Sequence, residues 1–375
     1  GHQVTIIEKN EKLGKKLFIT GKGRCNITND SDVENHLNHV ISNPKFMYSA
    51  FYSFDSSRMI DFLEQEGLAV KTERGNRVFP QSDKSSDVLQ TLQKALRRRN
   101  VTVRLHTKMT GLMIEDHICK GVKVQSYHGA LETLTADDVI LTTGGLAYPS
   151  TGSTGDGHRL LKQAGVALEP CYPALVPVET VEEWPIRLQG LSLRNVSLRV
   201  ERGSHKIYEE QGEMLFTHFG VSGPLVLSAS SLLGRKGAKD CKLHIDLKPA
   251  LSEEQLDERL QRDFAAQKNS MFKNSLGKLL PSKLIPVIVE LSEITPDKQV
   301  NEVTRQERHR LVKLCKDLTC TVKKLRDFPE AIVTGGGISV KAINPATMEL
   351  KEISHLFAAG ELIDVDSVTG GYNLQ

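Results

Sequence analysis

VTIIE (residues 4–8) and KKLFITGKGRCNITN (residues 15–29) are the two stretches that decide the predicted fold of this chain. The apolar run Val4 to Ile7 predicts a buried strand that ends at the carboxylate of Glu8. In a dinucleotide-binding α/β fold, an acidic residue after the second parallel strand accepts hydrogen bonds from ribose hydroxyls. Glu8 is therefore a candidate ribose ligand, and the alternative is an ordinary exposed glutamate after a strand.

The loop in the second stretch combines glycines with a cation, a thiol and an amide within six positions. Gly21 and Gly23 have no Cβ, so a planar ligand could approach the backbone closely there. Arg24 could neutralise a pyrophosphate or a reduced, anionic ring. Cys25 and Asn26 complete the group, and the alternative is a polar turn that holds no ligand.

Bulk properties exclude several classes of protein. The 375 residues suffice for two or three domains, and a hydrophobic fraction of 39% supports a packed core. No apolar run approaches the roughly 20 residues that span a bilayer, and no signal peptide is visible, so we expect no membrane contact. A net charge of +3 is too close to neutral to indicate nucleic-acid binding by itself.

The cysteines predict a reducing compartment and no metal site. None of the six forms a C-x-x-C pair, which argues against zinc. Scattered single cysteines in a chain of this size are typical of a reducing cytosol, so we expect a cytoplasmic location. The six are Cys25, Cys119, Cys171, Cys241, Cys315 and Cys320.

Apolar periodicity and capping signals predict the secondary structure. We expect helices over residues 33–68, 85–96, 252–300 and 304–314, with Ser85-Ser86-Asp87 and Ser252 as N-terminal caps. A turn is expected at residues 79–83. Strands are expected at residues 101–105, 111–118, 121–127, 139–145, 191–200, 206–208, 214–216, 241–247, 319–325 and 331–338.

A second glycine-rich block follows the strand expected at residues 139–145, which we expect to be buried. Thr143, Gly144 and Gly145 lead into a loop, residues 148–157, that opens a helix. Backbone N–H groups at such a helix start favour a negative group. Asp156 could simply cap the helix, but the glycine and Tyr-Pro content favours a loop beside a cofactor.

The composition of the sequence changes after Cys171, where prolines become frequent. We predict a β-rich inserted domain over residues 171–251 and 301–330, and a helical subdomain over residues 252–300. His218 lies in LFTHFGVSGP (residues 215–224) and could donate a proton to a substrate, or could be structural at a turn. The basic residues of 305–326 could form a surface for a polyanion, with solvated charge as the simpler alternative.

Four blocks of the chain resemble the BaiN-like flavoprotein oxidoreductases, also called aminoacetone-oxidase-like FAD-binding enzymes. Residues 12–29 are close to the usual K-L-G-R-K-L-x-x-S-G-G-G-R-C-N-x-T-N, with Thr20 and Lys22 in place of a serine and a glycine. Residues 143–157, 215–224 and 333–375 match in the same order. The T-G-D-G sequence also resembles fumarate-reductase and aspartate-oxidase flavoproteins.

The resemblance implies an α/β architecture. It is a Rossmann-like FAD-binding domain of the two-dinucleotide-domain flavoprotein type, discontinuous over residues 1–170 and 331–375, around the inserted domain and the helical subdomain. Such a fold needs a first strand, a G-x-G-x-x-G turn and a helix before the ribose carboxylate. We expect that unit ahead of Gly1, because these 375 residues do not carry it.

The resemblance also implies which residues hold FAD. An acidic side chain of the G-E…D tail (residues 360–364) would hold the ribityl hydroxyls, and residues 370–375 would open a helix toward the isoalloxazine ring. The expected FAD contacts are Glu8, Lys16, Thr20, Gly21, Gly23, Arg24, Cys25, Asn26, Val103, Thr143, Gly144, Gly145, Asp156, Gly360, Glu361, Asp364, Gly371, Asn373 and Leu374.

The implied function is the reduction of an activated C=C bond, in a small molecule or in a ribosomal RNA uridine, with electrons from NADH or NADPH. Candidate proton donors are Cys25, Tyr148, His218 and Tyr372. Two alternatives stay open. One is a flavin-dependent amine oxidase that uses oxygen, and the other is a non-enzymatic flavin-containing RNA-binding protein that contacts RNA through the basic inserted domain.

Overall fold

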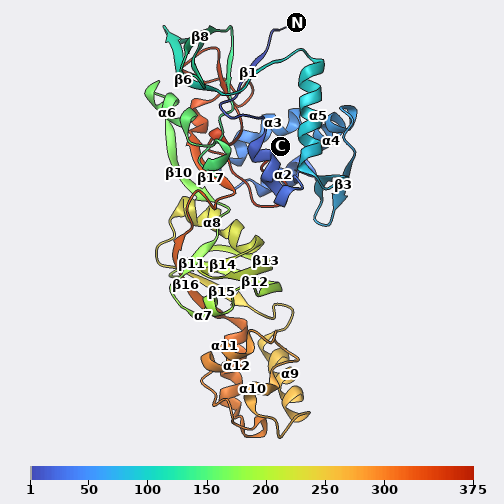
Figure 1. The fold of residues 1–375 in the computed structure, drawn as a ribbon. Coiled ribbons are helices and arrows are strands. Elements are labelled where there is room, and N and C mark those ends of the chain that lie inside the picture. Colours follow the sequence, from blue (N-terminus) through green and yellow to red (C-terminus); the bar gives the residue numbers. More distant parts are fainter. Residues whose placement is uncertain (1) are drawn as a thin grey trace. The chain divides into compact units, whose positions relative to one another are not determined.

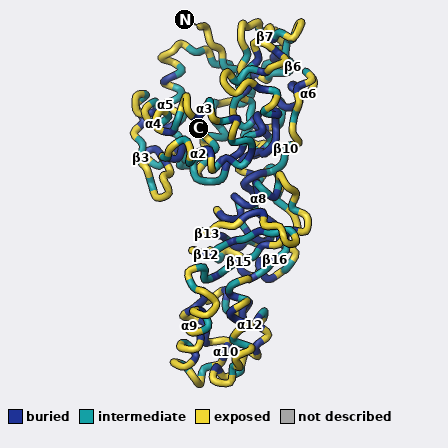
Figure 2. Tube along the Cα trace, turned by 180° about the vertical axis from the view of Figure 1, so that it is seen from behind, coloured by how far each residue is buried: buried dark blue, intermediate teal, exposed yellow. Residues whose placement is uncertain are grey.

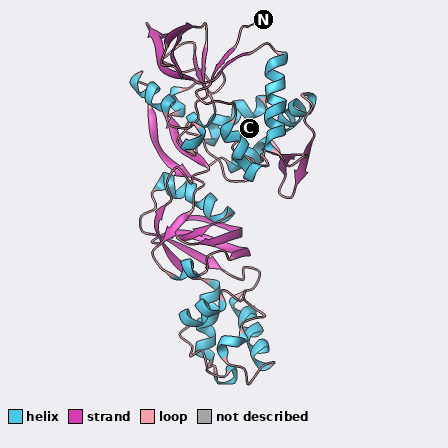
Figure 3. Cartoon of the chain, viewed as in Figure 1, coloured by secondary structure: helices cyan, strands magenta, loops and turns pink. Residues whose placement is uncertain are grey.

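The computed structural model describes residues 2–375, which form two compact units of mixed helices and strands (Figure 1, Figure 3). Unit 1 comprises residues 2–174 and 327–375, and unit 2 comprises residues 175–326. The chain therefore leaves unit 1 once and returns to it once. The further division of the inserted part at residue 252 stays a prediction.

Two parallel strand pairs define the α/β character of unit 1. Strand β1 (Thr5–Ile7) pairs with β5 (Thr102–Arg104), and β9 (Val139–Leu141) pairs with β18 (Leu356–Ala358). Parallel pairing requires a crossover connection rather than a hairpin. The second pair joins the strand before Thr143 to the strand before Gly360, so two predicted site segments leave the same edge of one sheet.

The remaining strands of unit 1 are antiparallel. β6 (Thr107–Glu115), β7 (Ile118–Ser126) and β8 (Leu131–Thr135) form a meander, which confirms the predicted hairpin and adds a third strand. β2 (Thr28–Asn29), β4 (Arg77–Pro80) and β3 (Val70–Glu73) form a second sheet. β10 (Leu168–Ala174) pairs with β17 (Val333–Ile338).

Several helices of unit 1 differ from the expected ones. The single helical region expected over residues 33–68 is three α-helices, because Asn43 is left-handed (φ 55°) before Pro44 and Asp55 starts a new helix as an N-cap. The other helices include the predicted one at residues 85–96. The α-helices are α1 (Lys15–Ile19), α2 (Val33–His39), α3 (Tyr48–Ser53), α4 (Ser56–Gln65), α5 (Ser85–Arg98) and α6 (Asp156–Gln163).

Four local expectations were wrong. The cap of α5 is Lys84 rather than the serines, and Ser85 Oγ instead donates to Phe18 O at 2.6 Å. The expected turn at residues 79–83 begins as strand β4, where Phe79 is buried. The first strand is not buried, since β5 is its only partner in the described part of the chain. In β9, Ile140 is 66% exposed.

Unit 2 contains a closed six-stranded barrel in the order β11-β14-β13-β12-β15-β16. The expected strands at residues 206–208 and 214–216 are parts of one long strand, β13. The strands are β11 (Val178–Thr180), β12 (Ser192–Arg202), β13 (His205–Thr217), β14 (Gly220–Ser222), β15 (Cys241–Asp246) and β16 (Leu318–Leu325). Closure of the barrel leaves no open edge for another strand to pair with.

Helices complete unit 2. Ser252 and Thr304 are N-caps with full capping boxes, which confirms both predicted helix starts. The helices are α7 (Trp184–Arg187), α8 (Pro224–Lys236), α9 (Glu253–Ala265), α10 (Phe272–Ser275), α11 (Ile285–Leu291) and α12 (Arg305–Lys316). Buried side chains of the barrel and of these helices form one continuous core (Figure 2).

The helices are also short relative to a bilayer. Within residues 2–375, none is both long enough and apolar enough to cross a membrane.

Candidate functional site

The segment that carries Glu8 is tied to the loop before α6. Lys9 Nζ donates to Thr154 Oγ1 at 2.6 Å and to Asp156 Oδ2 at 2.8 Å. Asn10 Nδ2 donates to the Thr151 carbonyl at 3.0 Å. One carboxylate oxygen of Glu8 accepts the Asn10 N–H at 2.8 Å, which orients that side chain. These contacts fix two predicted site segments side by side, although they are about 140 positions apart in the sequence. Lys9 and Asn10, which make the contacts, were not among the predicted site residues.

Glu361 connects three other predicted segments. Its Oε1 accepts from the N–H of Thr334 at 2.8 Å and from the Thr334 hydroxyl at 2.7 Å, and its Oε2 pairs with Lys16. Thr334 Oγ1 in turn accepts the N–H groups of Leu146 and Ala147 at 2.7 and 3.0 Å. The side chains of Lys16 and Glu361 are only about one-fifth exposed, at 23% and 18%. The network holds α1, β17 and the loop after Gly145 in one arrangement.

The glycines of the second block are required by close packing. A Cβ on Gly145 would lie 2.3 Å from Thr334 Oγ1, inside the network around Glu361. Gly144 has a left-handed φ of 68°. The hydroxyl of Thr143 is buried and has no hydrogen-bond partner among residues 2–375. A buried hydroxyl without a partner costs free energy, so this atom is available to a ligand.

Arg24 is held by carboxylates of its own unit. Its guanidinium donates to Asp83 and Glu73 and stacks over the Phe79 ring, 4.0 Å from the centroid. The hydrogen bonds that Arg24 donates to Glu73, and secondly to Asp83, raise the pKa of its guanidinium. Lys71 joins the same cluster through Asp83 at 2.6 Å. The charge of Arg24 is therefore balanced by protein groups, and its contact with FAD stays a prediction.

Cys25 lies in the protein interior. Its exposed fraction is 0%, and burial raises the pKa of its thiol to about 11. Its backbone is left-handed, with φ 60°, which is uncommon for a residue other than glycine. Thr20 lies nearby and donates its hydroxyl to the Leu17 carbonyl at 2.7 Å. The burial of the thiol favours a structural role for Cys25 over contact with a substrate.

The tail residues contact helix α2 and one another. The Tyr372 hydroxyl donates to Asn35 Oδ1 at 2.9 Å, and its ring stacks on His39 with centroids 4.3 Å apart. Asn373 closes a turn, because its Oδ1 accepts the Ser367 N–H at 2.9 Å. Leu374 is 39% exposed. The phenol of Tyr372 is a donor to the protein itself.

The other predicted residues lie in several places. Asp364 is buried, and the Asn43 amide donates to its carboxylate at 2.9 Å. Val103 pairs with Ile6 in the β1–β5 sheet. Gly21 is tightly packed, since an added Cβ would lie 2.9 Å from the Asn26 nitrogen. Gly23 and Gly360 have positive φ angles, and nothing lies within 4 Å of an added Cβ at either.

The block at residues 215–224 lies in unit 2 and is a barrel hairpin. His218 is exposed in the turn between β13 and β14. Gly220 and Gly223 pack tightly against backbone, with added Cβ atoms 2.5 Å from Val178 O and 2.9 Å from Leu215 N. Barrel closure therefore explains the glycines of this motif without a ligand. The role of His218 as a proton donor stays a prediction.

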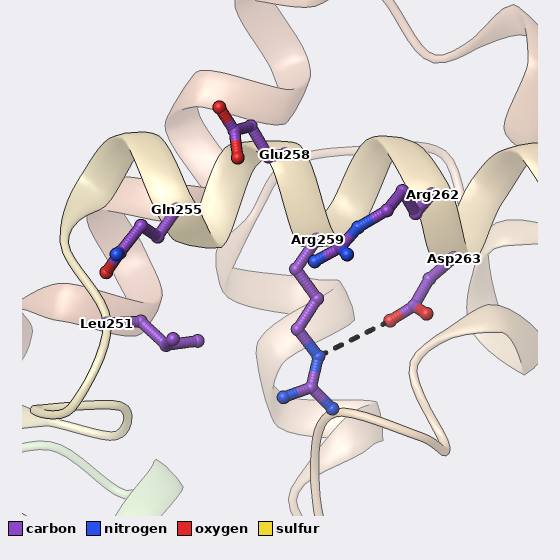
Figure 4. A pocket seen from close by; sticks show the side chains of 6 residues that line it. All are labelled: Leu251, Gln255, Glu258, Arg259, Arg262 and Asp263. Carbon is purple, nitrogen blue, oxygen red and sulfur yellow. Dashed lines mark ion pairs between the residues drawn. The ribbon is translucent and has the colours of Figure 1, made fainter.

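A surface hollow lies beside α9 in unit 2 and contains none of the predicted site residues (Figure 4). Arg259 pairs with Asp263 across it, with N and O 3.7 Å apart, and also donates to the Lys278 carbonyl at 2.9 Å. Paired charges along one helix are typical of a solvated surface. We therefore assign no chemistry to this hollow.

The residues of unit 1 fit an FAD molecule. Such a cofactor presents hydroxyl groups, two phosphates and a flat ring system. The buried hydroxyl of Thr143 offers a hydrogen bond, and open space lies beside the backbone at Gly23 and Gly360. Glu8 and Lys16 add a carboxylate and an ammonium group on segments that the Lys9 and Glu361 contacts fix in place.

Known proteins resemble this chain over its whole length. Residues 1–375 match the family described as the HI0933-like protein Rossmann domain. The chain belongs to this HI0933-like family. It is 30% identical over 375 residues to 3-dehydro-bile acid delta(4,6)-reductase of Clostridium scindens, which covers 100% of this chain and 89% of that protein. It is 28% identical over 381 residues to ribosomal RNA dihydrouridine synthase of Escherichia coli K12, with the same coverage of 100% and 89%.

A solved structure also aligns with most of this chain. The 3-ketosteroid-delta4-(5alpha)-dehydrogenase of Rhodococcus jostii RHA1 aligns with a TM-score of 0.49 at 13% identity, over 99% of this chain and 89% of that chain. As a member of the HI0933-like family, the chain is an FAD-dependent oxidoreductase with a Rossmann-like nucleotide-binding fold. The family resemblance, the fold class and the enzyme class that the sequence predicts are thereby confirmed.

The ion pairs of Asp156 predict a specific pH dependence. Burial alone would raise the pKa of this carboxyl, but the Lys9 hydrogen bond and charge outweigh it and lower the pKa from 3.8 to about 2. A carboxylate with a depressed pKa stabilises the fold above its unfolded pKa, and the contribution is lost as the pH falls through the folded value. We expect the free energy of unfolding to fall between about pH 4 and pH 2.

Urea titrations of the wild type and of Asp156→Asn across this range test that expectation. The variant should lose less stability than the wild type between the two pH values, because it has no carboxylate to protonate. Asp137→Asn, at an exposed position, is the matched control. Parallel curves for the wild type and Asp156→Asn would contradict the assignment.

Proposed function

We propose that this protein reduces a C=C bond conjugated to a carbonyl group, with electrons from NADH or NADPH. One observation carries this proposal. Two curated relatives with unlike substrates are named for the same change, since a delta(4,6)-reductase and a dihydrouridine synthase both add hydrogen across a C=C bond. Electrons from NAD(P)H also favour a cytoplasmic location.

FAD, when bound, supplies the hydride for such a reduction. We assign Glu8 to a ribose, because its carboxylate is oriented by Asn10 beside the loop before α6. Glu361 would lie near the ribityl chain, as the resemblance implies for an acidic side chain of this tail, and Lys16 is its ion-pair partner. The Thr143 hydroxyl would then find the partner that it does not have within the described residues.

We assign the proton donor to Tyr148. Its phenol is half-buried, has no hydrogen-bond partner among the described residues, and follows Gly145 by three positions. The other candidates fit less well, because Cys25 is buried and the Tyr372 hydroxyl already donates to Asn35. The phenolic Oη–H of Tyr148 would give its proton to the substrate carbon that does not receive the hydride.

A second substrate class is favoured by charge. Unit 2 has 25 lysines and arginines against 20 aspartates and glutamates, a net charge of 25 − 20 = +5. A basic unit attracts polyanions through counterion release. We therefore propose ribosomal RNA, bound through unit 2, as the alternative to a small conjugated ketone.

Anaerobic oxidation of NADH and NADPH by the FAD-loaded protein tests the proposal. The acceptors are a steroid-like conjugated ketone and unmodified ribosomal RNA, and the products are analysed by mass spectrometry. We expect one acceptor to gain two hydrogen atoms as the nucleotide is oxidised. Turnover of amines with oxygen alone would replace the proposal with an amine oxidase. RNA retention without reduction would replace it with a non-enzymatic RNA-binding protein.

Glu8→Ala tests the ribose assignment. Loss of hydrogen bonds to a charged acceptor costs about 1.5–3 kcal/mol, so the Kd for FAD should rise about 10- to 150-fold. Quenching of flavin fluorescence on binding measures this Kd. Glu11→Ala is the control, because Glu11 is exposed and its ion pair with Lys15, at 3.3 Å, is on the surface. Equal FAD affinity of Glu8→Ala and the wild type would remove Glu8 from the site.

A further inference from the structure

We infer that Asn26, Thr28 and Asn29 are positioning residues that clamp the tail segment, residues 370–375. We call these three residues the tail clamp. The inference rests on the proposed function in one respect, namely that the tail segment faces the flavin. The contacts between the clamp and the tail are independent of that function.

The Asn26 amide joins the tail to the β2–β4 sheet. Its Oδ1 accepts the N–H of Gly371 at 2.9 Å, and its Nδ2 donates to the Val78 carbonyl at 3.3 Å. Both ends of the amide are therefore used by the protein backbone. A side chain bound at both ends in this way connects the two backbone segments that it contacts.

Thr28 and Asn29 hold the tail from the adjacent strand, β2. The Thr28 hydroxyl donates to Gln375 Oε1. Asn29 Nδ2 donates to the carbonyls of Gly370 at 3.0 Å and Gly75 at 2.9 Å, which uses both of its hydrogens. Both side chains are almost fully buried, at 0% and 2% exposure. The clamp is thus an interior contact between segments 340 positions apart.

The backbone of the tail lies directly against the clamp. A Cβ on Gly371 would lie 2.5 Å from the Thr28 carbonyl oxygen, a distance that real side chains do not show. Gly371 also has a φ of 103°, which disfavours any residue with a Cβ. Glycine is therefore required here for the approach of two backbones, which explains why Gly371 occurs in a motif that resembles a cofactor site.

Other contacts hold the tail segment to itself and to α2 and the end of α3. Asn373 binds the backbone at Ser367 and Val368, within the same loop. The Tyr372 ring stacks on His39 of α2. Loss of the clamp should therefore loosen residues 370–375 without unfolding unit 1, since each clamp residue contributes only one or two of these hydrogen bonds.

Hydrogen exchange of the FAD-loaded protein tests the clamp directly. Thr28→Val and Asn26→Ala should raise amide exchange in residues 370–375 about 5- to 10-fold, because each variant removes hydrogen bonds to the tail. Thr28→Ser keeps the hydroxyl and should restore the wild-type rate. Unchanged exchange in Thr28→Val and Asn26→Ala would overturn the inference.

A second measurement distinguishes positioning from stability alone. The flavin absorption spectrum and midpoint potential should shift in Gly371→Ala but not in Gly67→Ala, where φ is 94° and nothing lies within 4 Å of the added Cβ. Faster tail exchange with an unchanged spectrum and potential would show that the tail does not position the flavin, which overturns the inference. Neither readout requires turnover, so a failure of the proposed reduction would be seen separately.

Discussion

Replacement of Tyr148 by phenylalanine should lower kcat for C=C reduction about 10²- to 10⁴-fold, the usual contribution of a positioned general acid. The substitution removes only the phenolic oxygen and keeps the half-buried aromatic ring. Binding of FAD and its reduction by NAD(P)H precede the proton transfer, so both should be close to wild type. Rapid-reaction kinetics that follow flavin reduction and reoxidation separately measure the two half-reactions.

Tyr127→Phe is the matched control for this prediction. Tyr127 is 79% exposed in the loop between β7 and β8, so the loss of its hydroxyl should leave both half-reactions unchanged. A Tyr148→Phe enzyme that reoxidises at the wild-type rate would exclude Tyr148 as the donor. His218→Ala would then be the next variant, because His218 is the remaining exposed candidate.

Phe216→Ala should destabilise unit 2 by about 3–5 kcal/mol, the cost of truncating a fully buried phenylalanine. The Phe216 side chain is 0% exposed inside the barrel and meets the Trp184 ring edge-on at 5.8 Å between centroids. Its removal leaves a cavity that the closed barrel cannot easily collapse around. Urea unfolding followed by Trp184 fluorescence measures the change, because Trp184 is the single tryptophan.

Ile186→Ala is the control for the barrel prediction, since Ile186 is 37% exposed on α7 beside the same tryptophan. It should cost less than about 1 kcal/mol, as most substitutions of exposed residues do. Equal losses in the two variants would show that Phe216 is not at the centre of the folding core.

The sequence predicted the blocks of the site because each block has a local signal. The strand before Glu8, the glycines after β9 and the Gly360-Glu361 pair all show apolar runs that end at chemically distinctive residues. Parallel pairing of β9 with β18 then places two of these blocks at one sheet edge, as the α/β pattern indicates. The helix starts at Ser252 and Thr304 were equally local, because a capping box spans only four residues.

The contacts of the candidate site residues could not be predicted from the sequence around them. Glu73 and Asp83 lie 49 and 59 positions from Arg24, so the sequence could not show that its charge is balanced by carboxylates. Thr334, which joins Glu361 to the loop after Gly145, lies within an apolar strand that predicts only burial. Lys9 could have been noticed as the residue next to Glu8, but its partner Asp156 is known only from the fold.

The first strand shows that the burial of a strand cannot be predicted from its apolar residues alone. Apolar residues at Val4 to Ile7 predicted a buried strand, yet Val4 is 47% exposed, because burial depends on which elements cover a strand. The motif at residues 215–224 also shows that packing depends on the fold and not on the local sequence alone. The motif matches the flavoprotein family in sequence, and close backbone packing in the barrel hairpin explains its glycines.

A single-turnover experiment tests the central claim most directly. The FAD-loaded protein is photoreduced under anaerobic conditions, so no nicotinamide is needed, and is then mixed with a conjugated ketone or with unmodified ribosomal RNA. If the protein reduces C=C bonds, flavin absorbance returns with one of these acceptors, and one molecule of saturated product forms per flavin. If the flavin stays reduced with both and reoxidises only when oxygen is admitted, the protein is not a C=C reductase of either substrate class.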